Sequence, residues 1–369
     1  MSLLPTTLLL PQQTISKSWV SLDLPRLAAI FGTNGVVVHG HSLERSHQLA
    51  DILARAPKDI TIRTWCHNGD EPTVDVAEQL RADLRANRPD WVAAIGGGSV
   101  LDLAKSAAGL LEAPEHPRFY QKNVQSIPAA TMPFIALPTT AGTGSEATIV
   151  AVLTDPTCNA KQSIRHPSFM PRMVLLDPEL LKTCPPGVIA ASGLDAFIQA
   201  FESLTSRYAT PFTRHLSELA LIHIARTLLP FYRGDPSVAA ELLEASYLAG
   251  LALSQARLGV VHGLAHPLGA RFKISHGLAC AYCFPACLEF NYACVKKDLQ
   301  MIASRYKINI EECFQNWLEA MQIKNPLRGK TIPDRASILR EILESGSTTA
   351  NPRTVTITNA EALLEAVFR

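Results

Sequence analysis

The chain has 369 residues, a length that corresponds to about two domains, and 47% of its residues are hydrophobic, enough to fill sizeable cores. Its 34 basic and 33 acidic residues leave a net charge of +1, which argues against a nucleic-acid partner bound through overall basicity. No run of about 18 apolar residues occurs and the first residues lack the basic segment of a secretory signal, so no membrane partner is expected. Eight cysteines in a chain of this length do not suggest a disulfide scaffold, and we expect reduced thiols and a cytoplasmic location.

The first half of the chain alternates strand patterns with helix patterns. Short apolar or β-branched runs that predict strands occur at residues 35–40, 60–65, 91–97, 134–140, 148–155 and 173–180. Helical spacing of apolar residues occurs between them, at residues 43–56, 74–86 and 101–111. Such alternation predicts an α/β domain with a parallel, Rossmann-like sheet and helices on both of its faces.

The pattern changes after residue 184, where strand signals nearly vanish. Long helical patterns follow at residues 189–203, 211–229, 239–256 and 298–306, and Pro185-Pro186 marks the change. We therefore predict an α/β domain over residues 1–184 and an all-α helical domain over residues 185–369. Active sites often lie in clefts between such domains.

The strongest local signal is a glycine-rich turn between a predicted strand and a predicted helix. Gly96, Gly97, Gly98 and Ser99 stand at this turn. Without Cβ atoms the backbone can approach a diphosphate closely, and the first amides of the following helix favour an anion. A plain turn at a strand end is the alternative, and the glycines lack the G-x-G-x-x-G spacing of the standard dinucleotide fingerprint.

A second loop, over residues 137–146, is dense in hydroxyl groups and small residues. Its threonines, Thr139, Thr140 and Thr143, suit a ribose, a phosphate or a carboxamide, although Ser/Thr/Gly loops are also common without a ligand. Two such loops at the ends of neighbouring strands strengthen the indication of a nucleotide site.

Acidic and imidazole side chains of the second half occur at helical spacing. Asp195 and Gln199 are four residues apart, as are His262 and His266, and His276 follows ten residues later. Residues four apart share one helix face, and a carboxylate with neutral imidazoles can bind Zn²⁺ or Fe²⁺. Hydrogen-bonded core histidines are the alternative, and spacing alone does not decide which two of the three histidines bind a metal.

Together these segments resemble the iron-containing (group III) alcohol dehydrogenase family. The resemblance is carried, in the family's order, by GGGSVLDLAKSAA, LPTTAGTGSEAT, LLDPEL, SGLDAFIQAFE, VVHGLAHPLGARFKISHG and TANPRTVT. It implies a dehydroquinate-synthase-like architecture, with a dinucleotide-binding domain over residues 1–184 and a helical metal- and substrate-binding domain over residues 185–369. It also implies a metal in the cleft between the domains.

The resemblance assigns roles to individual residues. It implies that Asp195, His262 and His276 bind the metal, whereas His266 matches a histidine beside the substrate that is not a ligand and is the candidate catalytic residue. The cofactor-binding positions that it implies are Gly96, Gly97, Gly98 and Ser99, with Asp102 close by, then Thr139, Thr140 and Thr143, and Lys161 near the nicotinamide ribose.

The fourth metal position departs from most iron-type members of that family, because Gln199 stands where they have a histidine. A neutral amide oxygen is a weaker donor to a transition metal than an imidazole nitrogen. The metal is accordingly Zn²⁺ or Fe²⁺, bound weakly, or absent. Cys280 follows His276 by four residues and is an alternative ligand, with a small buried core residue as the other interpretation. Cys280 would share a helix face with Cys283 and Cys287, which is equally a core stripe.

The cofactor prediction depends on the end of the strand at residues 35–40. NAD-specific members of the family place there an aspartate that accepts hydrogen bonds from the ribose hydroxyls. Here the position is Gly40, followed by His41 and Ser42, and the loss of a carboxylate removes repulsion against a 2′-phosphate. We therefore predict that NADP(H) is favoured over NAD(H), with Gly40 and Ser42 lining the site and His41 or Arg45 as the cationic partner.

Basic residues flank the histidine segment, among them Arg257, Arg271 and Lys273. One interpretation is a solvated surface. The other is an anion-binding wall for an aldehyde that carries a carboxylate, phosphonate or sulfonate, with Arg257, five residues before His262, as the candidate substrate contact.

The predicted function is metal-assisted hydride transfer between a nicotinamide and a small aldehyde or alcohol. Depending on the direction of the reaction, the enzyme is an aldehyde reductase or an alcohol dehydrogenase. A lyase or cyclase of the dehydroquinate-synthase kind, which uses NAD transiently, is one alternative. A catalytically degenerate relative, suggested by Gln199, is another. A homodimer is compatible with the sequence.

Overall fold

The computed structural model describes residues 2–69, 71–122, 125–129, 131–157 and 160–369, and the chain forms two compact units. The α/β unit comprises residues 9–185, and the helical unit comprises residues 186–369 together with the N-terminal residues up to Leu8. The backbone N–H of Phe212 donates to the carbonyl oxygen of Leu3 at 3.1 Å, which attaches the N-terminal residues to the helical unit.

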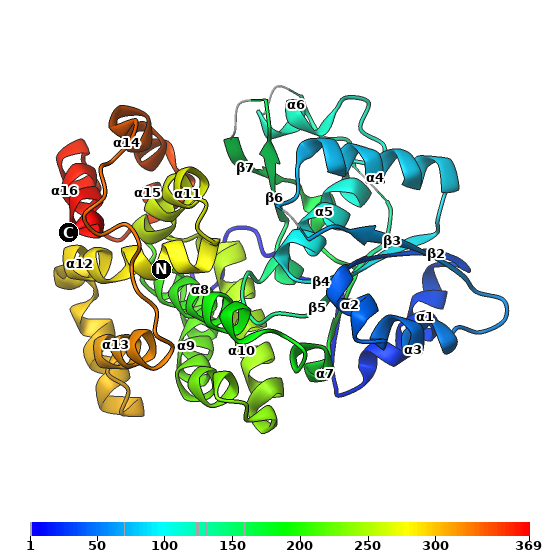
Figure 1. Ribbon diagram of the computed structural model, residues 1–369, viewed down its shortest axis with the longest axis horizontal. Coiled ribbons are helices and arrows are strands. Elements are labelled where there is room, and N and C mark those ends of the chain that lie inside the picture. Colours follow the sequence, from blue (N-terminus) through cyan, green and yellow to red (C-terminus); the bar gives the residue numbers. More distant parts are fainter. Residues whose placement is uncertain (1, 70, 123–124, 130, 158–159) are drawn as a thin grey trace. The chain divides into compact units, whose positions relative to one another are not determined.

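The α/β unit is built on a parallel sheet of six strands with the order β1-β8-β5-β4-β2-β3 (Figure 1). This confirms the predicted fold class. The strands of this sheet are β1 Gln13–Ser16, β2 Asn34–Gly40, β3 Thr61–His67, β4 Trp91–Gly96, β5 Phe134–Pro138 and β8 Met173–Leu176. Every residue of β4, β5 and β8 is buried, as expected of strands covered on both faces.

The helices of the α/β unit connect these strands. They are α1 Leu24–Ala28, α2 His41–Arg45, α3 Gln48–Ala54, α4 Val74–Asn87, α5 Gly98–Gly109, α6 Pro117–Gln121 and α7 Pro178–Leu181. Short 3₁₀ turns occur at Val20–Asp23, Ala29–Phe31, Ser145–Ala147 and Pro167–Phe169.

The single helix predicted over residues 43–56 is wrong, because two short helices, α2 and α3, occupy this segment. His47 lies between them with φ 61°, a left-handed conformation that interrupts a helix. The hydroxyl of Ser46 donates to the carbonyl oxygen of Leu43 at 3.0 Å, a local bond of the kind that competes with helix continuation.

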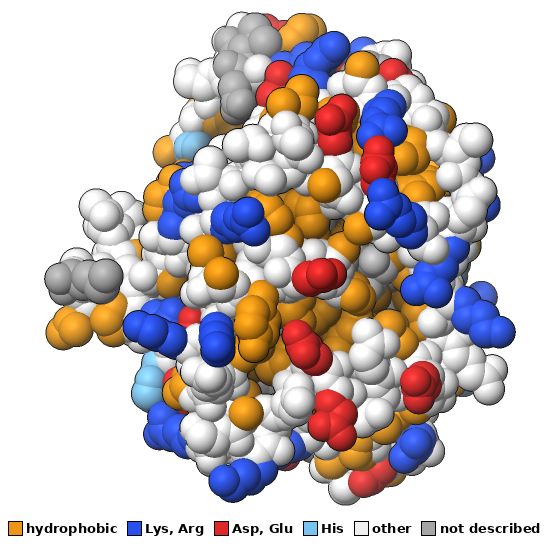
Figure 2. All heavy atoms as spheres, turned by 90° about the vertical axis from the view of Figure 1, so that its left-hand side faces the viewer, with side chains coloured by type: hydrophobic (Ala, Val, Ile, Leu, Met, Phe, Trp, Pro, Cys, Tyr) orange, Lys and Arg blue, Asp and Glu red, His pale blue; other side chains and the backbone are white. Residues whose placement is uncertain are grey.

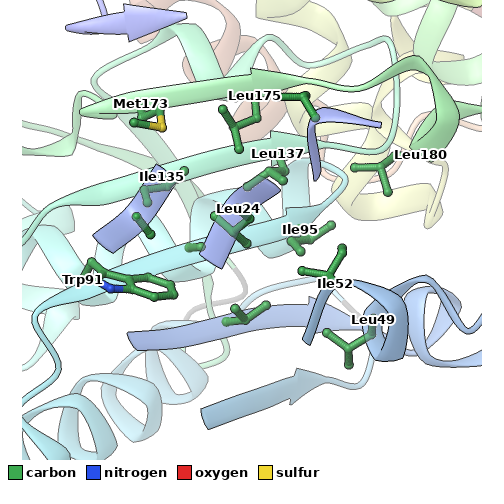
Figure 3. Close-up of a cluster of buried hydrophobic side chains, with 14 of the residues drawn as sticks. Leu24, Leu49, Ile52, Trp91, Ile95, Ile135, Leu137, Met173, Leu175 and Leu180 are labelled. Carbon is green, nitrogen blue, oxygen red and sulfur yellow. The ribbon is translucent and has the colours of Figure 1, made fainter. Parts of the chain in front are cut away.

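One face of the parallel sheet packs on a buried hydrophobic cluster (Figure 3). Trp91 and Ile95 of β4, Ile135 of β5 and Leu175 of β8 contribute to it. Leu24 of α1 and further side chains of α3 cover them. Burial of apolar surface stabilises the folded state by about 25 cal/mol per Å². The sheet is therefore a firm support for the loops at its edge.

The strand order places a topological switch point between β2 and β4. From β2 the chain proceeds outward to β3, and from β4 it proceeds in the other direction to β5. Ligands of open parallel sheets bind outside the carboxyl ends of the strands at such a point. Gly40 ends β2 and Gly96 ends β4, so two of the predicted cofactor positions lie there.

The strand predicted at residues 148–155 is present as β6 Val150–Asp155, but it lies outside the parallel sheet. It pairs antiparallel with β7 Ala160–Arg165, a strand that the sequence analysis missed. The burial of β6 alternates along its length, as it does in a strand with one covered face.

The helical unit consists of long helices and shorter C-terminal ones (Figure 1). They are α8 Pro186–Thr205, α9 Pro211–Tyr232, α10 Ala239–Ala256, α11 Val260–Phe272, α12 His276–Tyr306, α13 Ile310–Ala320, α14 Arg335–Glu344, α15 Gly346–Ala350 and α16 Ile357–Phe368, with a 3₁₀ turn at Pro236–Val238. The all-α second half is therefore confirmed.

Helix α12 is much longer than the pattern at residues 298–306 indicates. Among the described helices it alone is long and apolar enough to pass for a membrane span, and half of its most apolar window is buried inside the protein. A buried core helix gives the same signal. The face of the molecule in Figure 2 carries basic and acidic side chains interspersed around exposed hydrophobic ones, in keeping with the near-neutral net charge.

Candidate functional site

The two predicted cofactor loops lie against each other in the α/β unit. The backbone N–H of Thr139 donates to the carbonyl oxygen of Gly96 at 3.1 Å. Gly97 caps α5 and Gly98 begins it, so the first amides of that helix are at the loop. A Cβ atom on Gly98 would be 2.7 Å from Cγ2 of Thr143, closer than side chains pack. The missing Cβ therefore permits the contact between the loops.

We expect Gly98→Ala to weaken dinucleotide binding by about tenfold, because the added methyl group must push Thr143 and its loop away. Thr143→Ser removes the clashing Cγ2 atom and should restore part of the lost affinity in the double variant. Gly187→Ala is the control, since nothing lies within 4 Å of a Cβ atom on that glycine. The Kd for NADPH, measured by nicotinamide fluorescence, checks the prediction, and equal affinities of wild type and Gly98→Ala would contradict it.

A buried polar network holds the second loop against α5. Asp102 accepts hydrogen bonds from the hydroxyl of Ser145 at 2.6 Å and from the N–H of Val152 at 3.0 Å. The ammonium group of Lys105 donates to the hydroxyl of Ser145 and the carbonyl oxygen of Val150, both at 2.8 Å. Burial lowers the pKa of Lys105 to about 8, although Asp102 opposes the shift. Asp102 thus positions the loop, and Lys105 is a residue that the sequence analysis missed.

The end of β2 leaves room next to Gly40. A Cβ atom there would meet only Cγ2 of Val100 at 3.6 Å and the hydroxyl of Ser42 at 4.0 Å. The space next to Gly40 therefore admits a Cβ atom, so a clash at Cβ does not explain the absence of an aspartate. A carboxylate that the sequence analysis did not consider lies nearby, since Glu44 accepts from Nδ1 of His41 at 3.2 Å.

Lys161 lies on β7 in an ion pair with Glu71, with 2.7 Å between Nζ and Oε2. The partner is an exposed glutamate, so the ammonium group can exchange it for a ligand at little cost.

In the helical unit three helices bring the predicted metal residues together. Asp195 lies on α8, His262 on α11, and His276 is the first residue of α12. The Nε2 atoms of His262 and His276 are 3.3 and 3.8 Å from Oδ1 of Asp195. With Sγ of Cys280 these donor atoms lie within 4.8 Å of one another. Cys280, the alternative ligand of the sequence analysis, therefore belongs to the cluster.

A glycine explains how α12 approaches α8 closely enough. A Cβ atom on Gly277 would be 1.9 Å from the carbonyl oxygen of Ala191, one turn before Asp195 on α8. Only a residue without a Cβ atom allows this contact between the two backbones. Gly277 thereby places His276 beside Asp195.

Glu202 supports His262 from behind and was not predicted. Its Oε2 accepts from Nδ1 of His262 at 2.6 Å, and its Oε1 accepts from the N–H of Val261 at 2.7 Å. The Nδ1 proton is then committed to Glu202, so in the neutral ring Nε2 carries the lone pair that a metal ligand needs. A ligand histidine held by a second carboxylate is typical of metal sites.

The electrostatics of the cluster favour a cation. Burial opposes charge on the histidines, yet Cys280 and Asp195 raise the pKa of both His262 and His276 above the ordinary value. Burial alone would raise the pKa of Asp195, but His276 and His262 lower it. The donors are thus stabilised by positive charge, which a divalent ion supplies.

The buried amide of Gln199 gives a second sign that a ligand fits here. Gln199 lies one turn after Asp195 on α8 and is 4% exposed. Among the described residues its Oε1 atom has no hydrogen-bond partner. A buried acceptor without a partner costs free energy unless a ligand satisfies it. The donors present therefore fit a divalent metal, with Gln199 facing a ligand or water.

His266 and Arg257, two further predicted residues, differ in how they relate to this cluster. The ring of His266 stacks on that of His276, with 5.0 Å between centroids. Arg257 is exposed at the end of α10, with its guanidinium 4.8 Å from the centre of the Tyr208 ring. Cys283 and Cys287, in contrast, are fully buried, and burial raises the pKa of both thiols well above the ordinary value, as in core residues.

Comparisons with known proteins point to one family. Residues 11–178 match the sequence model of iron-containing alcohol dehydrogenases, and residues 189–368 match that of the C-terminal domain of Fe-containing alcohol dehydrogenases. The chain is 28% identical to an NADPH-dependent butanol dehydrogenase of Clostridium saccharobutylicum, over 94% of each chain.

Two other comparisons cover different shares of the chain. The chain is 40% identical to the probable alcohol dehydrogenase EutG of Escherichia coli, and that match spans 63% of this chain and 60% of that relative's length. The fold is similar to that of a sulfoacetaldehyde reductase from Bifidobacterium kashiwanohense, solved in complex with NAD⁺. Its TM-score is 0.89 at 23% identity, over 98% of both chains.

Proposed function

Because the chain belongs to the iron-containing alcohol dehydrogenase family, we propose that it transfers hydride between a nicotinamide cofactor and a small aldehyde or alcohol with the help of a divalent metal. The observation that carries this proposal is the cluster of Asp195, His262 and His276, with Glu202 behind one histidine and an unsatisfied amide oxygen of Gln199 beside it. Such a donor set is costly to bury without a ligand, and a bound metal ion would offset that cost.

Each residue group has a distinct role in the proposed reaction. Asp195, His262 and His276 hold the metal, with Cys280 and Gln199 as the neighbouring donors, and when bound the metal stabilises negative charge on the substrate oxygen. The loops around Gly98 and Thr143 bind the nicotinamide dinucleotide, which supplies the hydride when bound. His266 is half-buried beside His276 and passes a proton between the substrate oxygen and solvent.

An aldehyde panel tests the function. We expect the protein to consume NADPH with small aldehydes. This activity should fall when a chelator removes the metal and recover when Fe²⁺ or Zn²⁺ is added. A dehydroquinate-synthase-like enzyme would return the nicotinamide unchanged, and a degenerate relative would show no turnover with any metal. Either result would overturn the proposal.

NADP(H) is the proposed cofactor, because no side chain at Gly40 repels a 2′-phosphate. A relative named as NADPH-dependent supports this choice. We expect a higher kcat/KM with NADPH than with NADH, and Gly40→Asp should shift the preference toward NADH, since its carboxylate would repel a 2′-phosphate and the space at Gly40 admits a Cβ atom. A preference of the wild type for NADH of about tenfold, or about 1.4 kcal/mol, would contradict the proposal.

We further propose an anionic aldehyde as substrate, with Arg257 as its contact, a choice in keeping with a structural neighbour that is a sulfoacetaldehyde reductase. Arg257 has φ 62° and ψ −174°, a backbone conformation that only glycine adopts without strain. A side chain kept at a strained position indicates a functional demand.

Arg257→Gly and Arg257→Ala separate the two effects at this residue. Both remove the guanidinium, so both should lose activity on anionic aldehydes and keep it on neutral ones. Only the glycine substitution relieves the backbone strain, so Arg257→Gly should be more stable than Arg257→Ala by about 1–2 kcal/mol. Activity on all aldehydes that is equal to wild type in both variants would assign Arg257 to the solvated surface.

The remaining predictions concern the context of the protein. The boundary at residue 184, a cytoplasmic location, a homodimer and the lack of nucleic-acid and membrane partners stay predictions. The boundary at residue 184 can be tested by limited proteolysis near Pro185-Pro186.

A further inference from the structure

A second cluster of metal-type donors lies in the α/β unit, at the carboxyl ends of β2 and β3. The parallel register pairs His39 of β2 with Cys66 of β3, so both side chains emerge on one face of the sheet. Glu44 reaches the same place from α2. One donor atom from each of these three side chains lies within 4.8 Å of the others.

His39 is buried with an unsatisfied nitrogen that faces this cluster. Its side chain is 1% exposed, and among the described residues its Nε2 atom has no hydrogen-bond partner. Oε1 of Glu44 is 3.9 Å from that atom. On the other side of the ring, Nδ1 is 3.3 Å from the carbonyl oxygen of Gly40 and must donate to it. In the neutral ring Nε2 then carries the lone pair, which is the form in which imidazole binds a metal.

His41 is the candidate fourth donor, although it lies outside the set of three residues whose donor atoms are all within 4.8 Å of one another. Its Nδ1 atom is 3.3 Å from Sγ of Cys66 and 3.2 Å from Oε2 of Glu44. Around a tetrahedral zinc ion, with bonds of about 2.0–2.3 Å, the ligand atoms are about 3.3–3.8 Å apart. Two imidazoles, a thiolate and a carboxylate form a mixed nitrogen and sulfur set that suits Zn²⁺ better than Mg²⁺ or Ca²⁺.

We propose that His39, Glu44 and Cys66, with His41 beside them as the fourth donor, bind a Zn²⁺ ion that is separate from the metal held around Asp195. Zinc binding removes the proton of the Cys66 thiol to solvent as the Zn–S bond forms. The four side chains carry one negative charge before binding, on Glu44, and the zinc-loaded site is neutral, since two anionic ligands balance the ion. Zinc therefore satisfies His39 and cancels a charge at the end of β2.

The loss of this negative charge has a consequence that rests on the proposed function. The 2′-phosphate of NADP(H) is proposed to lie beside Gly40, the neighbour of His39 in the chain. Zinc loading should then strengthen NADPH binding by about two- to threefold, the effect of one charge at about 8 Å when water screens it fully, and change NADH binding less.

Zinc stoichiometry of the full-length protein tests the site. After equilibration with excess Zn²⁺ and removal of free metal, the wild type should retain one zinc ion more per chain than Cys66→Ser or Glu44→Gln. Cys66 is part-exposed and Glu44 exposed, so both variants should fold. Cys294→Ser is the matched control, because Cys294 is exposed on α12 outside both clusters, and it should retain as much zinc as the wild type.

Substitution with Co²⁺ gives a second readout. The visible and near-ultraviolet absorption of a cobalt–thiolate bond should weaken in Cys66→Ser and stay unchanged in Cys294→Ser. Equal zinc content and equal cobalt spectra in the wild type and both cluster variants would overturn the proposal. A protein that retains the extra zinc but binds neither NADPH nor NADH would overturn the proposed function and leave the zinc site standing.

Discussion

Glu202→Gln is expected to lower the affinity for the metal by about 10–100-fold. The substituted amide can still accept from the N–H of Val261, so the start of α11 stays in place. It no longer offers a carboxylate to Nδ1 of His262, which makes the imidazole a weaker donor and frees its orientation. The loss should appear as a lower metal content after competition with a chelator.

The dependence of activity on metal concentration distinguishes a positioning role from a direct one. We expect kcat/KM to fall with the metal content and to recover at saturating metal, since Glu202 does not contact the reacting atoms. Glu218→Gln is the matched control, because Glu218 is another largely buried glutamate of the helical unit that bonds Arg305 at 3.1 Å and Tyr306. An activity of Glu202→Gln that stays low at saturating metal would refute the positioning role.

Signals carried by local residue pattern were predictable from the sequence. The glycine turn at Gly97, the helix spacing of His262 and His266, and the buried strand at β4 each depend on neighbours a few residues away. The parallel sheet and the helical second half follow from hydrophobic period, which covers long segments and is robust to single exceptions. The pattern also led to the acid and imidazole residues that the structure brings together.

Features that depend on contacts between distant segments could not be read from the sequence. Glu202 is an ordinary helix residue until α11 places His262 against it, 60 positions along the chain. Gly277 has meaning only because α8 passes within 1.9 Å of its missing Cβ atom. Cys280 resembled its core neighbours Cys283 and Cys287, and only its distance to His276, 3.7 Å, sets it apart.

The second metal-type cluster also depends on a contact between distant segments that the sequence alone does not reveal. His39 and Cys66 are separated by 27 positions, and the register of β2 against β3 makes them neighbours. A one-residue shift of that register would turn the two side chains to opposite faces of the sheet. The sequence predicted both strands but had no means of fixing their register.

Glu146→Gln is expected to stabilise the protein at pH 8 and to have little effect at pH 4.5. Glu146 is 2% exposed in the second cofactor loop, and burial raises its pKa from 4.5 to about 7. The folded state therefore holds this proton more tightly than the unfolded state, so its contribution to stability is full below pH 4.5 and is lost as the pH rises through 7. The loss at pH 8 is about 3 kcal/mol, which a neutral amide of the same shape avoids.

Thermal unfolding of both proteins between pH 4.5 and pH 8 measures this difference. The gain in Tm of Glu146→Gln over the wild type should grow with pH and level off above 7, because the carboxyl is then ionised in the folded state. Glu112→Gln is the control for a Glu-to-Gln substitution at an exposed site near the end of α5. A gain for Glu146→Gln that is the same at both ends of the range would mean that the buried carboxyl does not titrate there. The stability of the cofactor loop would then depend on the bonds of Lys105 and Asp102 alone.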